Sequence, residues 1–238
     1  MEFDEGYAFG IGAFETIAVY NGRPVFLEAH LERIKKTLNF LGIDKTIEVE
    51  FLTEKAKELY GEAVLKLLVS EKNILCQTRE NPYKQGAYEK GFSLEISTMC
   101  RNDTSSFVFH KTFNYGENLF EKRKALKNGL DDYLFLNTKG KLTETSAANL
   151  FLVRDGLVMT PGTGCGLLPG IVRNYLLERY TVLETEIAAE EISTCEECFV
   201  TNSLMGVMPV KRIGKTEFHS RAVAGAWRAD YLEQIRIL

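Results

Sequence analysis

A series of short apolar segments separated by tight turns, between residues 132 and 160, restricts the fold of this chain more than any other feature. Candidate strands at 132–137, 149–154 and 157–160 are connected through turn residues at 138–140 and through Asp155-Gly156. Strands of this length, joined by turns this tight, are typical of a compact barrel-like or mixed sheet. We therefore expect the C-terminal half of the chain to be built around such a sheet.

The N-terminal half has a different pattern, a hairpin followed by a helix and further strands. Segments 14–20 and 24–27 flank Asn21-Gly22, the commonest two-residue hairpin signal. Leu31, Ile34 and Leu38 recur at helical spacing, which predicts a helix over 28–41 with a stop at Gly42. The remaining elements expected in this half are a helix at 49–60 and strands at 63–70, 74–78 and 92–97.

A polar stretch of small residues at 99–107 is the best candidate for a linker. The prediction is therefore an α/β (α+β) chain with a small N-terminal α/β domain (1–100), a linker (101–107) and a larger C-terminal barrel-like domain (108–238). In the second domain we expect helices at 117–128, 171–179 and 220–234, and further strands at 143, 182–184, 199–202 and 207–213.

Charge and cysteine content exclude several classes of function. A net charge of −4 argues against a nucleic-acid surface. The acidic N-terminus has no long apolar run, so neither a signal peptide nor a membrane span is expected, and the five cysteines fit reduced thiols in the cytoplasm. Cys195 and Cys198 form one CxxC, but no second pair accompanies it, so we expect no metal site and a small buried residue at Cys198.

Four features together indicate the chemistry of a pyridoxal phosphate site. Glu144, in a run of small residues, is suited to hold a pyridinium nitrogen protonated. Pro169-Gly170 precedes an apolar-periodic run, so the N–H groups of a helix start are available there for a phosphate. The Lys111 amine is suited to carry the cofactor and then a proton, and Arg33 to clamp the phosphate.

Six blocks occur in a fixed order along nearly the whole chain: FGIGAFET, AHLER, HKTFN, TETSAANLF, LLPGIVR and TNSLMGVMPV. This order resembles the class IV aminotransferases, the fold-type IV pyridoxal phosphate enzymes with the D-amino acid aminotransferase fold. The resemblance implies that Lys111 is the Schiff-base lysine, that Glu144 is the partner of the pyridine nitrogen and that Arg33 binds the phosphate. It also implies cofactor contacts from Ser146, Ala147, Leu168, Ile171, Val172, Asn202 and Ser203.

On the substrate side of the site we expect aromatic rings, a hydroxyl and a cation. The family places Phe14 and Thr16, which share one face of the first strand by period-two alternation, against the substrate, and Tyr115 is a further candidate. Family members often have an arginine after the third long strand, where this chain has Ser70-Glu71-Lys72. A substrate carboxylate still needs a cation, and among Lys72, Arg79 and Arg101 we favour Arg101.

The blocks AANLF and NSLMGVMPV, and the short spacing from Lys111 to Asn114, resemble the lyases of the family more than its branched-chain aminotransferases. We therefore expect a lyase that eliminates pyruvate from 4-amino-4-deoxychorismate to give 4-aminobenzoate, as in folate biosynthesis. An aminotransferase that uses branched-chain or D-amino acids with 2-oxoglutarate is the alternative, and a non-catalytic ligand-binding member is a remote one. The resemblance also implies a homodimer and a small-molecule amino substrate.

Overall fold

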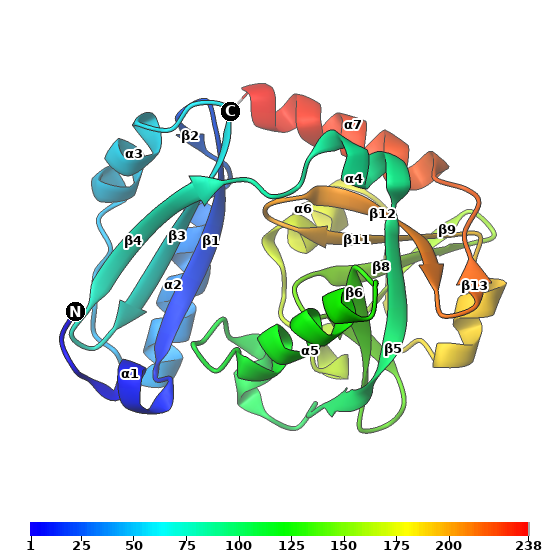
Figure 1. The fold of residues 1–238 in the computed structure, drawn as a ribbon, viewed down its shortest axis with the longest axis horizontal. Helices are drawn as coiled ribbons and strands as arrows, with labels where there is room; N and C mark the ends of the chain where they lie inside the picture. The colour runs from blue at the N-terminus through cyan, green and yellow to red at the C-terminus, as the bar shows by residue number, and fades with distance from the viewer. Residues whose placement is uncertain (238) are drawn as a thin grey trace. The chain divides into compact units, whose positions relative to one another are not determined.

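The computed structural model describes residues 1–237, which fold as two compact units (Figure 1). The first comprises residues 1–83, 110–115 and the chain end from Glu233, and the second comprises 84–109 and 116–232. This division differs from the expected linker at 101–107. The reason is that strand β5 (Phe92–Arg101), which we placed in the N-terminal half, pairs with strands β12 and β6 of the second unit.

The first unit is built on a four-stranded sheet in the order β2-β1-β3-β4. The strands are β1 (Gly12–Tyr20), β2 (Arg23–Pro24), β3 (Glu62–Ser70) and β4 (Ile74–Glu80), and the helices are α1 (Glu5–Phe9), α2 (Leu27–Leu41) and α3 (Val49–Lys57). Positive φ angles at Asn21 (46°) and Gly22 (81°) form the turn of the predicted hairpin, and Gly42 (71°) ends α2 as expected. Helix α3 ends before the predicted residue 60, and α1 was not predicted.

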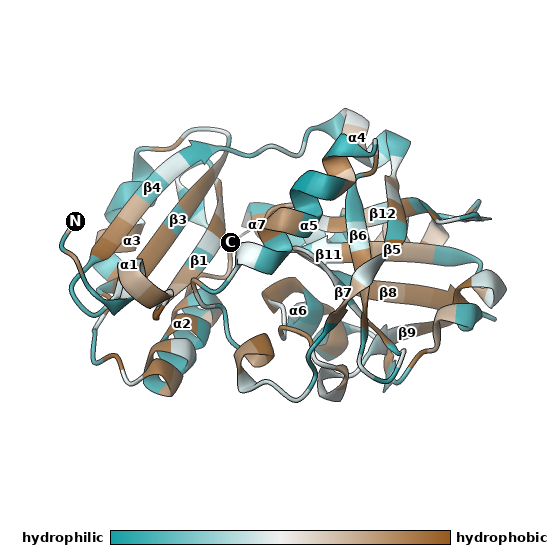
Figure 2. Cartoon of the chain, turned by 60° about the horizontal axis from the view of Figure 1, so that its bottom comes forward, coloured by the Kyte–Doolittle hydropathy of each residue, from teal (hydrophilic) through white to brown (hydrophobic). Residues whose placement is uncertain are grey.

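Alternation along β1 and β3 gives this sheet two different faces. Odd-numbered residues such as Ala13, Ile17 and Leu65 pack with Ile34 and Leu38 of α2 in one hydrophobic core. The apolar stretch of β3 is visible in Figure 2. Even-numbered residues lie on the opposite face, because successive side chains of a strand point to opposite sides.

The second unit contains a closed six-stranded barrel, as the pattern of short strands predicts. Its strands follow the ring β8-β11-β12-β5-β6-β7, and pairing of Glu144 on β7 with Asn149 on β8 closes the ring. Their bounds are β6 (Asp132–Asn137), β7 (Leu142–Thr145), β8 (Asn149–Arg154), β11 (Glu197–Asn202) and β12 (Gly206–Ile213). Strands β9 (Leu157–Pro161), β10 (Leu183–Thr185) and β13 (Thr216–Glu217) extend the sheet.

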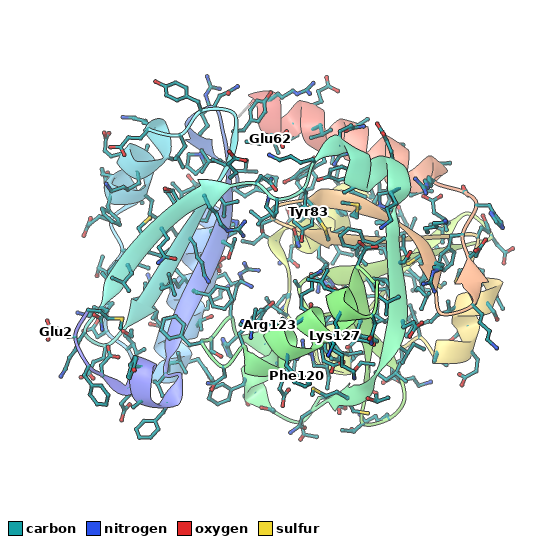
Figure 3. The ribbon with its side chains drawn as sticks, viewed as in Figure 1. Glu2, Glu62, Tyr83, Phe120, Arg123 and Lys127 are labelled. Atoms are coloured by element: carbon teal, nitrogen blue, oxygen red, sulfur yellow. The ribbon has the colours of Figure 1, made fainter. Side chains whose placement is uncertain are left out.

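The second unit also carries the remaining helices: α4 (Gln85–Lys90), α5 (Gly116–Lys127), α6 (Ile171–Arg179), most of α7 (Ala222–Ile237), and short 3-10 helices at Ser106–Phe109, Thr163–Cys165 and Ala189–Thr194. Helix α5 buries one face, whose residues are spaced three and four apart. The buried residues are Asn118, Glu121 and Ala125. Phe120, Arg123 and Lys127, which are labelled in Figure 3, are exposed. Among residues 1–237, no helix combines the length and apolar character needed to span a membrane.

Candidate active site

Lys111 lies against strand β1, within the first unit. The N–H of Phe14 donates to the Lys111 carbonyl at 3.0 Å, and the N–H of Phe113 donates to the Gly12 carbonyl at 2.8 Å. The Lys111 Nζ is 4.4 Å from the centroid of the Phe14 ring and 5.1 Å from that of Tyr115. These two rings meet edge to face, with centroids 5.1 Å apart. The backbone of β1 thus fixes the lysine, and two aromatic faces hold its amine.

Arg33 belongs to a buried cluster on the α2 side of the same sheet. Its Nε donates to Glu15 Oε1 and its Nη2 donates to Glu15 Oε2, both at 2.7 Å. Glu15 is fully buried, and its Oε2 also lies 2.6 Å from His30 Nδ1. The two bonds to one carboxylate fix the orientation of the guanidinium plane.

Burial and neighbouring charges shift the pKa values of Glu15 and His30. Burial by itself raises the pKa of Glu15, but Arg33 and His30 outweigh it and hold the pKa well below its ordinary range. Burial lowers the pKa of His30 against the attraction of Glu15, and the charges of Arg33 and Lys111 act in the same direction as burial. We therefore assign an ionised Glu15 paired with Arg33, and a neutral His30 that donates its Nδ1–H to Glu15.

Glu144 lies at the closure of the barrel, where three segments supply partners for its carboxylate. Its Oε2 accepts from the Leu168 N–H at 3.3 Å and from Asn149 Nδ2 at 3.4 Å, and its Oε1 is 3.4 Å from Arg101 Nη2. Asn149 Nδ2 also donates to the Leu168 carbonyl at 2.8 Å, which ties the loop before α6 to β8. The carboxylate is buried and held in one orientation.

Arg101, which we expect to hold a carboxylate of the substrate, is paired in the structure with Glu144, a carboxylate of the chain itself. Its role toward the substrate stays a prediction. Its guanidinium carbon lies 4.2 Å from the centroid of the Phe135 ring. Its Nη1 donates to Asn118 Oδ1 at 3.1 Å, and Asn118 Nδ2 donates to the Ser146 carbonyl at 2.7 Å. Arg101 therefore supports the segment that carries Glu144.

The start of α6 has the features of an anion site. No side chain caps its N-terminus at Gly170, where the amides of Ile171 and Val172 begin the helix. A Cβ atom at Gly170 would lie 2.1 Å from Asn149 Oδ1, so only glycine allows this close approach of the backbone. Thr201, opposite Asn149 on β11, has a buried Oγ1 without a hydrogen-bond partner among the described residues. These groups leave donors to be satisfied by a ligand.

The predicted cofactor residues of the second unit lie on connected segments. Asn202 Nδ2 donates to the Ala147 carbonyl at 3.1 Å, and its Oδ1 accepts from the N–H groups of Leu204 and Met205, each at 3.0 Å. Asn202 therefore shapes the turn that contains Ser203. The structure brings together Glu144, Leu168 and Arg101 in this unit, and Lys111, Phe14 and Tyr115 in the first.

Several residues of these clusters were not found from the sequence: Glu15, His30, Asn118 and Asn149. One signal was present for Glu15, since an acidic residue occupies an inward position of the apolar strand FETIAVY. His30 and Arg33, one helical turn apart on α2, are its natural partners. Cys198 is buried in β11 as expected, and the described residues contain no group of His, Cys, Asp and Glu arranged to hold a metal.

Comparison with known proteins identifies what this architecture is similar to. Residues 12–213 match the family model of class IV aminotransferases. An aminodeoxychorismate lyase of Bacillus subtilis is 25% identical over 244 residues, which cover 92% of this chain and 83% of that protein. A branched-chain-amino-acid aminotransferase of Pseudomonas aeruginosa is 22% identical and covers 86% of this chain and 76% of its own length.

Among solved structures, a 4-amino-4-deoxychorismate lyase from Pseudomonas aeruginosa superposes with a TM-score of 0.85 at 22% identity, over 99% of this chain and 96% of that one. The branched-chain amino acid aminotransferase of Escherichia coli superposes with a TM-score of 0.87 at 18% identity, over 99% and 89% of the two chains. At these identities the superpositions establish the shared fold, and they do not separate the two activities.

Proposed function

Because this chain belongs to the class IV aminotransferase family and is an enzyme, we propose that it is a pyridoxal phosphate-dependent lyase that releases pyruvate from 4-amino-4-deoxychorismate and leaves 4-aminobenzoate. The similarity to the Bacillus subtilis lyase supports this choice, as do the blocks AANLF and NSLMGVMPV. Family members act on small molecules, and the proposed substrate carries the amino group that the lysine of such a site requires.

The residues present fit pyridoxal phosphate. The uncapped start of α6 is suited to the phosphate, which the amides of Ile171 and Val172 would hold, and the family resemblance assigns Arg33 to the same group. Glu144, oriented by its three partners, would accept from the pyridine nitrogen. When bound, the cofactor supplies an electron sink that stabilises negative charge at the substrate carbon.

The chain's own residues supply positioning and proton transfer. Lys111 Nζ is the base that takes a proton from the substrate and returns it, and the backbone bonds to β1 hold it in place for that task. The rings of Phe14 and Tyr115 pack around the amine and exclude water from it. Thr16 lies on the same face of β1 as Phe14 and offers a hydroxyl to the substrate.

One observation carries the choice of a ring-shaped substrate, namely the pair of aromatic faces around the Lys111 amine. Flat walls are suited to a flat six-membered ring, and breaking the bond between that ring and the enolpyruvyl oxygen makes the ring aromatic. The lyase reaction consumes no second substrate. The alternative, an aminotransferase, is supported by the similarity to the Pseudomonas aeruginosa aminotransferase and requires a keto acid as amino acceptor.

The discriminating experiment supplies 4-amino-4-deoxychorismate to the cofactor-loaded protein without any keto acid. Pyruvate and 4-aminobenzoate are expected in equal amounts over many turnovers. If no product forms, while a branched-chain amino acid or D-alanine reacts only when 2-oxoglutarate is added, the lyase proposal is wrong and the aminotransferase replaces it. The Lys111→Ala variant is the control, and it is expected to be inactive in both assays.

A further inference from the structure

Lys66 places a second cation on the sheet face that carries Phe14 and Thr16. Thr16 and Lys66 are directly opposite each other in the antiparallel pairing of β1 with β3, and Phe14 is opposite Leu68. Residues directly opposite in such a pair point to the same side of the sheet. Lys66 therefore lies on the face opposite α2, away from the hydrophobic core of the unit.

Lys66 and Lys111 approach the same aromatic ring. The Lys66 Nζ is 5.3 Å from the Phe14 ring centroid, and the Lys111 Nζ is 4.4 Å from it. One ring thus lies next to the amine that we propose to react and next to a second ammonium group. A substrate that packs on Phe14 would therefore lie close to both ammonium groups.

No carboxylate of the described residues neutralises Lys66. Its side chain is half-buried and forms no ion pair among residues 1–237. By contrast, the exposed Lys36 and Lys57 pair with glutamates one turn away on their own helices, at 2.7 and 2.6 Å. A partly desolvated cation beside an aromatic face, with no acidic partner, is available to pair with an anionic group of a ligand.

The other cations considered for this task either have a partner in the chain or are exposed. Arg101 pairs with Glu144 in the second unit. Lys72 is exposed in the turn between β3 and β4, and the exposed Arg79 donates to the carbonyl of Glu80 at 3.3 Å. In the first unit, Lys66 is the partly buried cation on the face of β1 and β3 that carries the Lys111 amine.

We propose that Lys66 binds a substrate carboxylate that is remote from the reacting amine, and that it thereby selects amino substrates with an anionic group across a flat ring. This inference rests on the proposed function and deepens it. The ring carboxylate of 4-amino-4-deoxychorismate lies on the side of the ring opposite its amine, and 4-aminobenzoate keeps both groups. Lys66 is thus a specificity-determining residue, and its contribution is to binding.

The test compares two probes that differ only in charge, 4-aminobenzoate and the uncharged 4-aminobenzamide. Their dissociation constants are measured with the cofactor-loaded protein and its variants by calorimetry. Lys66→Met is expected to weaken binding of 4-aminobenzoate about tenfold, as for loss of one charge-assisted contact. Binding of 4-aminobenzamide is expected to change by less than about twofold. Lys66→Arg retains the charge and is expected to retain most of the affinity for the carboxylate.

Lys72→Met is the matched control, because it removes an exposed lysine from the end of the same sheet. The inference is overturned if the wild-type protein does not prefer 4-aminobenzoate over the amide, if Lys66→Met weakens both probes equally, or if Lys72→Met has the same effect as Lys66→Met. Kinetics provide a second readout, since loss of a binding contact raises KM for the substrate with little change in kcat.

The two proposals fail in different ways. If the wild-type protein forms no 4-aminobenzoate from 4-amino-4-deoxychorismate, the lyase proposal fails, and the preference for the charged probe still decides the role of Lys66. If the wild-type protein turns over that substrate and Lys66→Met leaves both KM and probe affinity unchanged, the lyase proposal stands and the role of Lys66 is refuted.

Discussion

At the scale of single residues, the buried charges of the Glu15–His30–Arg33 cluster should contribute to stability. Glu15→Gln removes the carboxylate that pairs with the largely buried guanidinium of Arg33. Breaking a buried pair in this way costs about 3 kcal/mol or more. Urea denaturation of the variant should show this loss in the free energy of unfolding, whereas Glu50→Gln, an exposed change on α3, should show less than about 0.5 kcal/mol.

The pH dependence of this cluster has a defined sign. The pKa of His30 and the pKa of Glu15 are both lower in the folded protein than in the unfolded chain. Both groups therefore bind fewer protons when folded, and their contribution to stability is lost as the pH falls, first below about 6.5 for His30 and then below about 4.3 for Glu15. His30→Gln should remove the first part of this decline in thermal stability. A wild-type protein that gains stability between pH 7 and 5 would contradict the assignment of a neutral His30.

The proposed contact between Arg33 and the cofactor phosphate needs a test that is separate from the loss of the Glu15–Arg33 ion pair. Arg33→Ala alone leaves the buried Glu15 carboxylate with His30 but without its guanidinium partner, so the double variant Glu15→Gln/Arg33→Ala is the cleaner test. Compared with Glu15→Gln, it should bind pyridoxal phosphate more weakly by about 2 kcal/mol, as expected for removal of a charge-assisted bidentate contact. Affinity for pyridoxal, which has no phosphate, should be equal in the two variants. If the two variants also bind pyridoxal phosphate with equal affinity, Arg33 does not contact the phosphate.

Glu144 has a role that should affect turnover more than cofactor retention. Glu144→Gln keeps a hydrogen-bonding side chain, but a neutral amide cannot hold a pyridine nitrogen protonated, so the electron sink weakens. We expect kcat to fall about 100-fold or more, with the cofactor still bound, as measured by its absorbance after gel filtration. Glu190→Gln, an exposed change, is the control. Undiminished turnover in Glu144→Gln would exclude the role.

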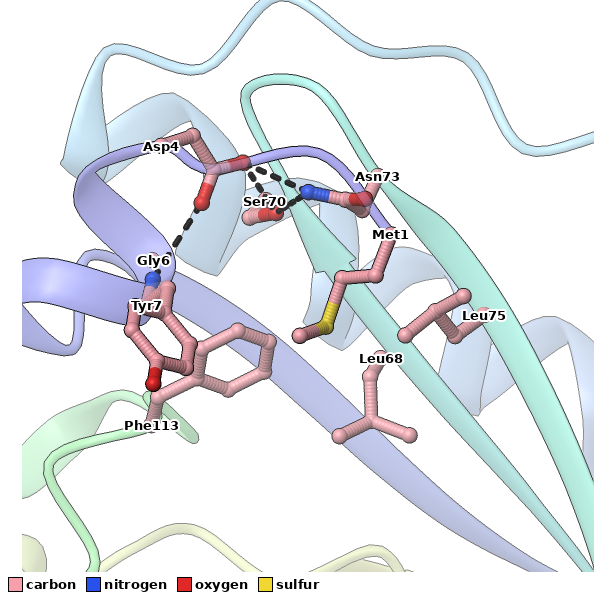
Figure 4. Close-up of a pocket in the computed structure, with 9 residues that line it drawn as sticks. All are labelled: Met1, Asp4, Gly6, Tyr7, Leu68, Ser70, Asn73, Leu75 and Phe113. Carbon is pink, nitrogen blue, oxygen red and sulfur yellow. Dashed lines mark hydrogen bonds between the residues drawn. The ribbon is translucent and has the colours of Figure 1, made fainter.

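At the scale of elements, Asp4 joins α1 to the turn between β3 and β4. Its carboxylate accepts from Ser70 Oγ at 2.6 Å, Asn73 Nδ2 at 2.9 Å and the Tyr7 N–H at 3.2 Å, beside a small apolar pocket lined by Leu68, Leu75 and Phe113 (Figure 4). The hydrogen bond from Ser70 is the largest of the influences that hold the pKa of Asp4 far below its ordinary range. One ionised side chain thus anchors the N-terminal helix to the sheet.

This anchor predicts a pH-dependent difference between the wild-type protein and Asp4→Asn. A lowered pKa means that the stabilisation is fully present above the ordinary aspartate pKa, about 3.9, and is lost as the pH falls below it. Asp4→Asn should therefore lower the melting temperature at pH 7, and the gap to the wild type should narrow as the pH falls below about 4. A gap that stays constant over this range would show that charge is not the cause.

At the scale of the whole molecule, we expect a homodimer, because the family resemblance implies a site that a second subunit completes. Sedimentation should give about twice the mass of one chain at working concentration. Dilution until monomers dominate should reduce the specific activity, since each site would lose its partner's contribution. A monomer with full activity would refute the idea of a shared site.

The sequence determined most elements and the family. Asn21-Gly22 and Gly42 specify a turn and a helix end through local backbone geometry, and the short strands between residues 132 and 160 specify a barrel-like sheet through their length and spacing. The order of the six blocks indicated the family, which the match over residues 12–213 confirms. The turn, the helix end and the short strands could be predicted because each depends on residues that are close in the sequence, and the family because the blocks keep their order along the chain.

Tertiary structure alone decided which distant residues meet. Strand β5 joins the barrel because its pairing partners, β12 and β6, come later in the chain, and no local signal specifies them. The pairing of Arg101 with Glu144 likewise has no local signal in the sequence. The position of Lys66 beside Phe14 depends on the register of β1 with β3, which only the structure gives. A charged side chain has many possible partners in a sequence, and the long-range pairing of strands, which places it within a few ångströms of one of them, selects its role.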